Sequence, residues 1–370
     1  MTKKQWGKTI SFLVIVLALT VMLTYMLRTN GAVKDRFAGF YAEKRNSIDV
    51  VMIGSSPVFP YYAAPQMYGE EGIMAYPLST NAQRPVAELY LAKEAYRRQH
   101  PSLMVFEVRM FTGDERILTE NMAYTRGVTD NLRYSWNRVE TVLGMLDESD
   151  VPGGFSPDDS DKKTYTYLFD IFKYHSNWRS LADPGQWRMA FFRKADPRKG
   201  YEGSTEVGPC TLPDLTGMTE EKAIPETQDD HLTELFQWLS AHHQQALFLV
   251  SPYAASETEA MEYNYIGRRV MEAGFGFLNL NDAYEEIGLD GATDFSDYGV
   301  HVNVCGSRKV TAYFEKYLKA NYDLPDRRGE GNTSWDDAYA LWQTESEAGI
   351  ETVQQHVKDG TYAEKQEQGG

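Results

Sequence analysis

Short apolar runs alternate with amphipathic stretches along most of this 370-residue sequence. Five runs are short, rich in aliphatic or aromatic residues and typical of buried strands: Ile48–Gly54, Ile73–Leu78, Leu103–Val108, Ala246–Tyr253 and Phe275–Asp282. Amphipathic stretches lie between or after them and predict helices at Val86–Gln99, His231–Gln245 and Val310–Tyr322. Strands that alternate with helices predict an α/β fold in which a central parallel sheet is covered on both faces.

A long uncharged segment precedes this pattern. From Thr9 to Leu27 nineteen residues carry no charge, and Lys8 and Arg28 flank them. At about 1.5 Å per residue, a helix of this length spans roughly 28 Å, which is enough for a bilayer core. The apolar stretch of a cleaved signal peptide is usually about 7–15 residues long, and no clear A-x-A site follows this one. We therefore expect residues 1–30 to form an uncleaved membrane anchor.

Basic residues lie on both sides of this segment, so the excess of positive charge does not decide its orientation. The tail before the apolar run is only eight residues long. A short tail of this kind is typical of a signal anchor that leaves the large C-terminal part outside the cell. We expect a single-pass protein of the cell membrane whose main domain is extracytoplasmic.

The remaining chain divides into a domain at residues 31–328 and a tail at residues 329–370. Within the domain, residues 112–230 are rich in Tyr, Trp, Asp and Gly, which indicates an insertion of helices and loops. From Glu330 to Gly370 there are nine acidic residues against Lys358 and Lys365. This composition predicts an acidic peripheral tail that wraps the domain as far as Trp342 and is largely disordered beyond it.

Charge and cysteine content exclude several classes of function. There are 37 Lys and Arg against 53 Asp and Glu, and the net charge of −16 repels polyphosphate, which argues against nucleic-acid binding. Cys210 and Cys305 are too few for a disulfide scaffold and lack metal-ligand spacing. They could form a bridge outside the cell, although small packing residues are the better interpretation. No P-loop, HExxH or dinucleotide fingerprint is present. We therefore expect no cofactor and no metal.

The first predicted strand ends at Gly54, and Ser55 and Ser56 follow it directly. Functional groups collect beyond the carboxyl ends of the strands in open α/β sheets. A serine at such a turn can present its hydroxyl and its own backbone N–H to one substrate carbonyl. The alternative is an ordinary turn or helix cap, in which Gly and Ser are also common.

A second polar segment follows the fifth predicted strand, and here Asp297 and His301 lie four residues apart. A serine nucleophile needs a base to take its proton, and the base needs an acidic partner to orient it. Asp and His in one loop could supply both. A capping turn and a weak metal-ligand pattern are the alternatives, and Asp294 is a second candidate for the acid.

Taken together, these segments resemble the SGNH/GDSL hydrolase superfamily, and most closely its membrane-anchored branch of DltD-like and polysaccharide O-acetylation proteins. Three blocks carry the resemblance: IDVVMIGSSPVFPYYAAPQMY, YPLSTNAQRP and DYGVHVNVCGSRKVT. The likeness covers about residues 46–342. It implies a flavodoxin-like three-layer sandwich and a serine esterase or O-acyltransferase, with Ser56 as nucleophile, His301 as base and Asp297 as orienting acid.

The resemblance also implies partners. The acyl acceptor would be a cell-envelope glycan or a teichoic acid, and the acyl group could come from an MBOAT-type membrane acyltransferase. The membrane anchor favours a transferase over a free esterase, because it keeps the site near lipid-linked polymers. The alternative is a non-catalytic anchored module that binds cell-envelope polymer or acts as a scaffold in an acylation complex.

The sequence departs from the superfamily at the block that should supply an oxyanion donor. Gly-x-Asn-Asp is expected after the third strand, where this chain has Glu107-Val108-Arg109. The substitutes would be the Ser56 backbone N–H and the loop Ser79–Gln83, in which Asn81 and Gln83 are candidate side-chain donors. We interpret Glu107 and Arg109 as a structural ion pair at the strand end.

Overall fold

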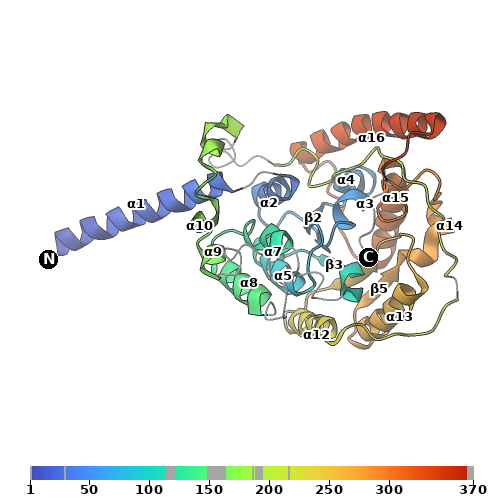
Figure 1. The fold of residues 1–370 in the computed structure, drawn as a ribbon, viewed down its shortest axis with the longest axis horizontal. Coiled ribbons are helices and arrows are strands. Elements are labelled where there is room, and N and C mark those ends of the chain that lie inside the picture. The colour runs from blue at the N-terminus through green and yellow to red at the C-terminus, as the bar shows by residue number, and fades with distance from the viewer. Residues whose placement is uncertain are drawn as a thin grey trace.

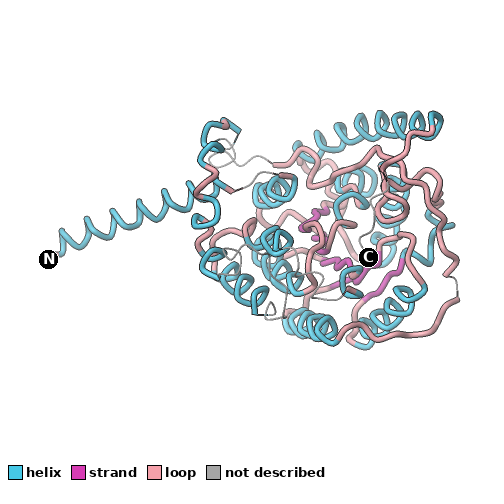
Figure 2. The backbone as a smooth tube through the Cα atoms, in the orientation of Figure 1, coloured by secondary structure: helices cyan, strands magenta, loops and turns pink. Residues whose placement is uncertain are grey.

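The computed structural model describes residues 2–28, 31–113, 122–147, 164–185, 187, 195–215 and 217–364. Its centre is a five-stranded sheet in the order β2-β1-β3-β4-β5, and all neighbouring strands are parallel. Figure 2 shows the strands in the middle of the molecule with helices around them. The strands are β1 (Val50–Gly54), β2 (Ala75–Ser79), β3 (Leu103–Glu107), β4 (Ala246–Val250) and β5 (Gly276–Asn279).

Helices cover both faces of the sheet, as the alternating pattern predicts. One face packs against α2 (Ala32–Ala42), α5 (Val86–Gln99), α12 (Glu226–Ala241) and α13 (Glu257–Glu272). The other packs against α3 (Val58–Tyr61), α4 (Ala64–Glu71), α14 (Tyr284–Ile287) and α15 (Val304–Asn321). Short 3-10 turns follow β3 and β5 as η1 (Arg109–Thr112) and η5 (Leu280–Ala283). The α/β class with a parallel central sheet is confirmed.

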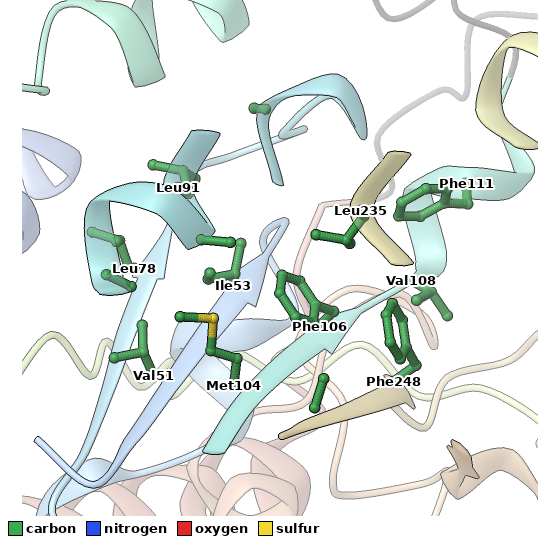
Figure 3. Close-up of a cluster of buried hydrophobic side chains, with 14 of the residues drawn as sticks. Val51, Ile53, Leu78, Leu91, Met104, Phe106, Val108, Phe111, Leu235 and Phe248 are labelled. Atoms are coloured by element: carbon green, nitrogen blue, oxygen red, sulfur yellow. The ribbon is translucent and has the colours of Figure 1, made fainter. Parts of the chain in front are cut away.

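The alternation of side chains along each strand explains why both faces are apolar. In β1, Val51 and Ile53 point to the first face, while Val50 and Met52 point to the second. Figure 3 shows the first face, where side chains of four neighbouring strands meet Leu91 of α5 and Leu235 of α12. A sheet that is buried on both sides requires continuous apolar runs, and such runs made the strands recognisable in the sequence.

The first helix projects from the body, as Figure 1 shows. It is α1 (Lys3–Leu27), and it is long and apolar enough to cross a membrane. Its C-terminal end packs against α10 (Ile171–Tyr174) and η4 (Trp178–Ala182), which belong to the region expected to be an insertion. The other described helices of that region are α7 (Met122–Thr129), α8 (Trp136–Asp147) and α9 (Thr164–Leu168). Other parts of the expected insertion lie outside the described residues.

The C-terminal segment differs from the expectation. We expected disorder beyond Trp342, but α16 (Thr333–Asp359) is one continuous helix along the edge of the molecule (Figure 1). It buries residues at helical spacing beyond that point, among them Gly349 and Val353. Val353 packs in a small apolar cluster with Val207 and Val304. A single narrow apolar stripe is enough to dock a helix. The acidic composition of this segment concealed that stripe in the sequence.

Candidate active site

The first strand ends where the chain connections of the sheet change direction. The connection from β1 leads to β2 on one side, and β3 lies on the other side of β1. Such switch points form a crevice at the carboxyl edge of a parallel sheet. Gly54 is the last residue of β1 and has φ of 152°, and a Cβ there would lie 2.6 Å from the Glu107 Cβ. Glycine therefore lets β1 turn closely beside β3 and places Ser55 and Ser56 at this crevice.

The loop before α15 supplies the histidine. An antiparallel bridge between Phe295 and Val302 joins the two ends of this loop. Within it, the backbone N–H of Ser296 donates to the His301 carbonyl at 2.9 Å. Asn303 then caps the start of α15, because its side-chain oxygen accepts from the backbone N–H groups of Cys305 and Gly306. The sequence thus folds a short loop whose ends are both fixed, with His301 near its end.

Ser56, His301 and Asp297 form one hydrogen-bonded chain. The Ser56 Oγ lies 2.8 Å from His301 Nε2, and His301 Nδ1 lies 2.6 Å from Asp297 Oδ2. The second carboxylate oxygen of Asp297 accepts from the His301 backbone N–H at 2.5 Å. Because an ionised carboxylate only accepts, we assign the imidazole proton to Nδ1. Nε2 then has a lone pair directed at the Ser56 hydroxyl, which is the arrangement that a general base needs.

Asp294, the other candidate for the acid, is engaged elsewhere. Its buried carboxylate is 2.6 Å from the ammonium of Lys309 on α15 and accepts from the Asp290 backbone N–H at 2.7 Å. The side chain of Asp297 is 41% exposed and that of His301 is 26% exposed. The structure therefore brings Asp297 to the imidazole, and the hydrogen-bonded chain reaches solvent.

Two side chains hold the residue before His301. The Val300 carbonyl accepts from the Tyr61 hydroxyl at 3.0 Å and from the Arg109 guanidinium at 2.8 Å. The Arg109 guanidinium also lies over the Tyr253 ring, 3.6 Å from its centroid. The expected ion pair between Arg109 and Glu107 is not formed, because the guanidinium turns to the histidine loop. Arg109 and Tyr61 are residues whose role the sequence did not indicate, although a charged residue directly after a buried strand marks the functional edge.

Glu107 is buried beside this site. The Ser251 backbone N–H donates to its Oε1 at 3.3 Å, and its Oε2 has no hydrogen-bond partner among the described residues. Burial raises the pKa of Glu107 to about 7, although Arg109 opposes the shift. Burial, together with the charge of Glu107, raises the pKa of Glu88 on α5 well above its ordinary value. A carboxyl pair that resists ionisation therefore lies behind the switch point.

The loop after β2 lies next to Ser55, because β1 and β2 pair in register with Gly54 opposite Ser79. The Gln83 backbone N–H donates to the Ser55 hydroxyl at 3.2 Å. Neither atom of the buried Gln83 side-chain amide has a hydrogen-bond partner within the described parts of the chain. Asn81 is exposed at the tip of the turn. Of the two candidate oxyanion donors, Gln83 is therefore the one that combines burial with an unused donor.

The two cysteines do not compete for the role of nucleophile. Both are free and half-buried, and burial raises the pKa of each thiol to about 11. Cys305 packs beside the small cluster of Val207 and Val304. Because the thiolate is the reactive form, neither sulfur is activated at neutral pH.

Fold and site together define an α/β protein with a Ser-His-Asp chain at the carboxyl edge of a parallel sheet. No protein-family model and no curated protein matches this chain. Its chemistry is therefore inferred from its own residues. A hydroxyl bonded to a neutral imidazole, which a carboxylate orients in turn, can attack an electrophilic carbonyl.

Proposed function

We propose that this protein is a membrane-anchored serine acyl-transfer enzyme of the SGNH type that acts on the cell envelope outside the cytoplasm. The observation that supports this most strongly is the hydrogen-bonded chain from Ser56 through His301 to Asp297. The strand order is that of flavodoxin-like sheets, which the resemblance to the SGNH superfamily implies. The long apolar α1 supports the membrane anchor.

The reaction proceeds in two transfers. The Ser56 oxygen bonds to the carbonyl carbon of an acyl ester, and its proton passes to His301 Nε2. The leaving alcohol departs with that proton, and the acyl group stays on Ser56. An acceptor hydroxyl then attacks the acyl carbon, its proton passes to Nε2, and Ser56 regains a proton as the ester forms on the acceptor. Asp297 stabilises the imidazolium in both transfers.

The proposed acceptor is a hydroxyl of an envelope polysaccharide or teichoic acid. The charged and half-exposed rim around Asp297 and His301 supports a polar acceptor that approaches from solvent. Water in the same position would give an esterase. An MBOAT-type membrane protein is the proposed acyl supplier, and it rests on the resemblance alone.

Covalent labelling of the full chain in detergent micelles tests this proposal. We expect a fluorophosphonate probe to modify wild-type protein, and mass spectrometry to find the adduct on the peptide that contains Ser56. Ser56→Ala should abolish labelling. Ser55→Ala is the matched control, because the Ser55 hydroxyl is buried against the Gln83 N–H and is not bonded to His301. That variant leaves the Gln83 N–H without its acceptor and should lose about 1–3 kcal/mol of stability, but the folded protein should keep its labelling.

Two outcomes would contradict the proposal. If folded wild-type protein is not labelled, the Ser-His-Asp chain is inactive and the alternative of a non-catalytic anchored module is favoured. If Ser55→Ala abolishes labelling and Ser56→Ala keeps it, the nucleophile is the other serine.

A further inference from the structure

The apolar helix α1 is not free along its whole length. Its last turn, from Thr24 to Leu27, is enclosed by the domain, with only Tyr25 partly exposed. The fifteen residues from Thr9 to Leu23 remain outside and span about 22 Å. The hydrocarbon core of a bilayer is about 30 Å thick. The free apolar length is therefore roughly 8 Å too short unless the domain itself enters the membrane surface.

Charged residues bound the N-terminal end of the apolar run. Lys8 precedes the apolar run, and Lys3 and Lys4 lie one turn further out. Trp6 is exposed between them, at the level where an aromatic ring marks a membrane interface. The other end of α1, where the helix enters the domain, is the place that can supply further apolar depth.

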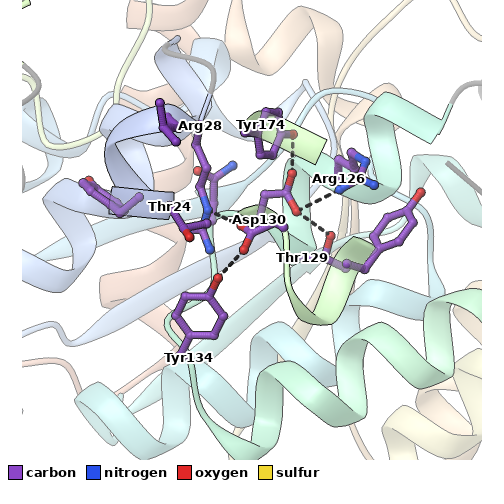
Figure 4. Close-up of polar contacts among 12 residues, drawn as sticks. Thr24, Arg28, Arg126, Thr129, Asp130, Tyr134 and Tyr174 are labelled. Atoms are coloured by element: carbon purple, nitrogen blue, oxygen red, sulfur yellow. Dashed lines mark hydrogen bonds and ion pairs between the residues drawn. The ribbon is translucent and has the colours of Figure 1, made fainter. Parts of the chain in front are cut away.

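The depth of that end is fixed by buried polar contacts (Figure 4). The Arg28 guanidinium lies 2.5 Å from the Asp170 carboxylate, and both side chains are buried. The Asn177 side chain donates to the Leu27 carbonyl at 3.1 Å. Burial alone would lower the pKa of Arg28, but Asp170 and Asp130 raise it above its ordinary value. A charged contact that ties α1 to the segment around α10 prevents the helix from sliding outward.

Exposed aromatic side chains lie on the elements that pack around this end of α1. Phe169 precedes Asp170 directly, Phe172 is on α10, and Trp178 begins η4. Their exposed fractions are 59%, 57% and 64%. We call these three residues the aromatic collar. Exposed large apolar side chains are typical of interaction sites, and these three lie on or next to elements that pack against the helix that needs about 8 Å more apolar depth.

We propose that the aromatic collar inserts into the interfacial layer of the same lipid bilayer that α1 crosses. This inference rests on the membrane anchor of the proposed function. The collar supplies the apolar depth that α1 lacks, because Trp and Phe rings are stable at the boundary between headgroups and acyl chains. The partner is the lipid itself, and the collar should be immersed when no other protein is present.

The test uses the full chain alone, reconstituted in phosphatidylcholine nanodiscs. In a Cys210→Ser, Cys305→Ser background, single cysteines at Phe172 and Trp178 carry an environment-sensitive fluorophore. Lipids with a spin label near the headgroup and aqueous iodide serve as competing quenchers. Leu17, which is exposed in the middle of α1, reports the span, and Met271, which is exposed on α13, reports a surface away from the collar.

We expect labels at Phe172 and Trp178 to emit at shorter wavelength and to be quenched several-fold more by the lipid spin label than the label at Met271. If both are instead quenched by iodide as Met271 is, while Leu17 is protected, the collar stays in water and the inference is overturned although the anchor stands. That result would direct attention to a protein partner for the collar. If Leu17 itself is quenched by iodide, the anchor fails and the inference fails with it.

Discussion

Two loops at the same edge of the sheet are built in opposite ways. In the loop that contains Asp297 and His301, both carboxylate oxygens, both imidazole nitrogens and the His301 carbonyl have hydrogen-bond partners. In the loop Ser79–Gln83, four buried side-chain atoms have none among the described residues. They are Ser79 Oγ, Thr80 Oγ1 and the two amide atoms of Gln83.

The difference in hydrogen-bond partners suits the two loops to different tasks. The groups proposed to move a proton are already aligned in the free chain, so they need no rearrangement when a substrate binds. Buried polar groups without a partner are destabilising, by about 1–3 kcal/mol each. A loop that keeps several of them beside the proposed nucleophile is suited to a ligand that supplies the missing partners, such as a developing oxyanion.

The largest effect on rate is expected from substitutions in the loop that contains Asp297 and His301. His301→Ala removes the base and should lower the rate of Ser56 acylation by a fluorophosphonate by about 10⁴-fold or more, because a nucleophile without its base is weak. Asp297→Asn should lower it by a similar order, since the amide changes the tautomer that the imidazole adopts. Stopped-flow measurement with purified full chain gives these rates.

The matched control for this experiment is Asp294→Asn. It removes the charge that pairs with Lys309 and should lower the melting temperature. The acylation rate of the folded fraction should stay close to wild type. If Asp294→Asn slows acylation as strongly as Asp297→Asn, the imidazole depends on the buried Asp294 carboxylate, and our assignment of Asp297 as the acid is wrong.

A smaller effect on rate is expected in the loop Ser79–Gln83, where buried side-chain atoms lack partners among the described residues. Gln83→Ala should lower the acylation rate by roughly 10²–10³-fold, which is the usual effect of losing one oxyanion donor. Asn81→Ala should change it little, because Asn81 is exposed. The melting temperature of Gln83→Ala should not fall by more than a few degrees, since its amide makes no hydrogen bond in the described structure. An unchanged rate would assign the oxyanion to backbone N–H groups alone.

The smallest effect concerns Glu107, which lies behind both loops. Its pKa is about 7 in the fold against an ordinary 4.5, so the folded chain binds its proton more tightly than the unfolded chain. The free energy of unfolding should therefore fall as the pH rises from about 4.5 to 7. Glu107→Gln removes this fall and should stabilise the protein at pH 8 by up to roughly 3 kcal/mol, with no difference near pH 4.

Urea unfolding at several pH values measures this effect, and the exposed Glu234→Gln on α12 is the control. If Glu107→Gln instead destabilises the protein at pH 8, Glu107 is held as an anion.

The sequence was sufficient to predict the sheet and to propose Ser56, His301 and Asp297. Buried parallel strands need continuous apolar runs, and the helix expected at Val86–Gln99 has those bounds in α5. It did not reveal α13, although Ser256 and Glu259 form a capping box at its start and the spacing is visible in the sequence.

The supporting contacts of the site were beyond sequence reasoning for a physical reason. Arg109 and Tyr61 donate to the Val300 carbonyl, which lies 191 and 239 residues further along the chain. Which carbonyl faces a strand end depends on how loops from different strands meet. No local pattern encodes that meeting, so the ion pair between Arg109 and Glu107 was the simplest local interpretation and it was wrong.

The contact between Arg28 and Asp170 bears on how the protein can be divided. A hydropathy profile suggests that a soluble domain could be obtained by cutting a few residues after Leu27. Such a cut runs through a shared core, because it takes the Arg28 guanidinium from a fully buried carboxylate at a loss of about 3 kcal/mol. The end of the first helix and the domain thus share one packed unit. A truncated form should begin before Thr24 to keep that unit whole.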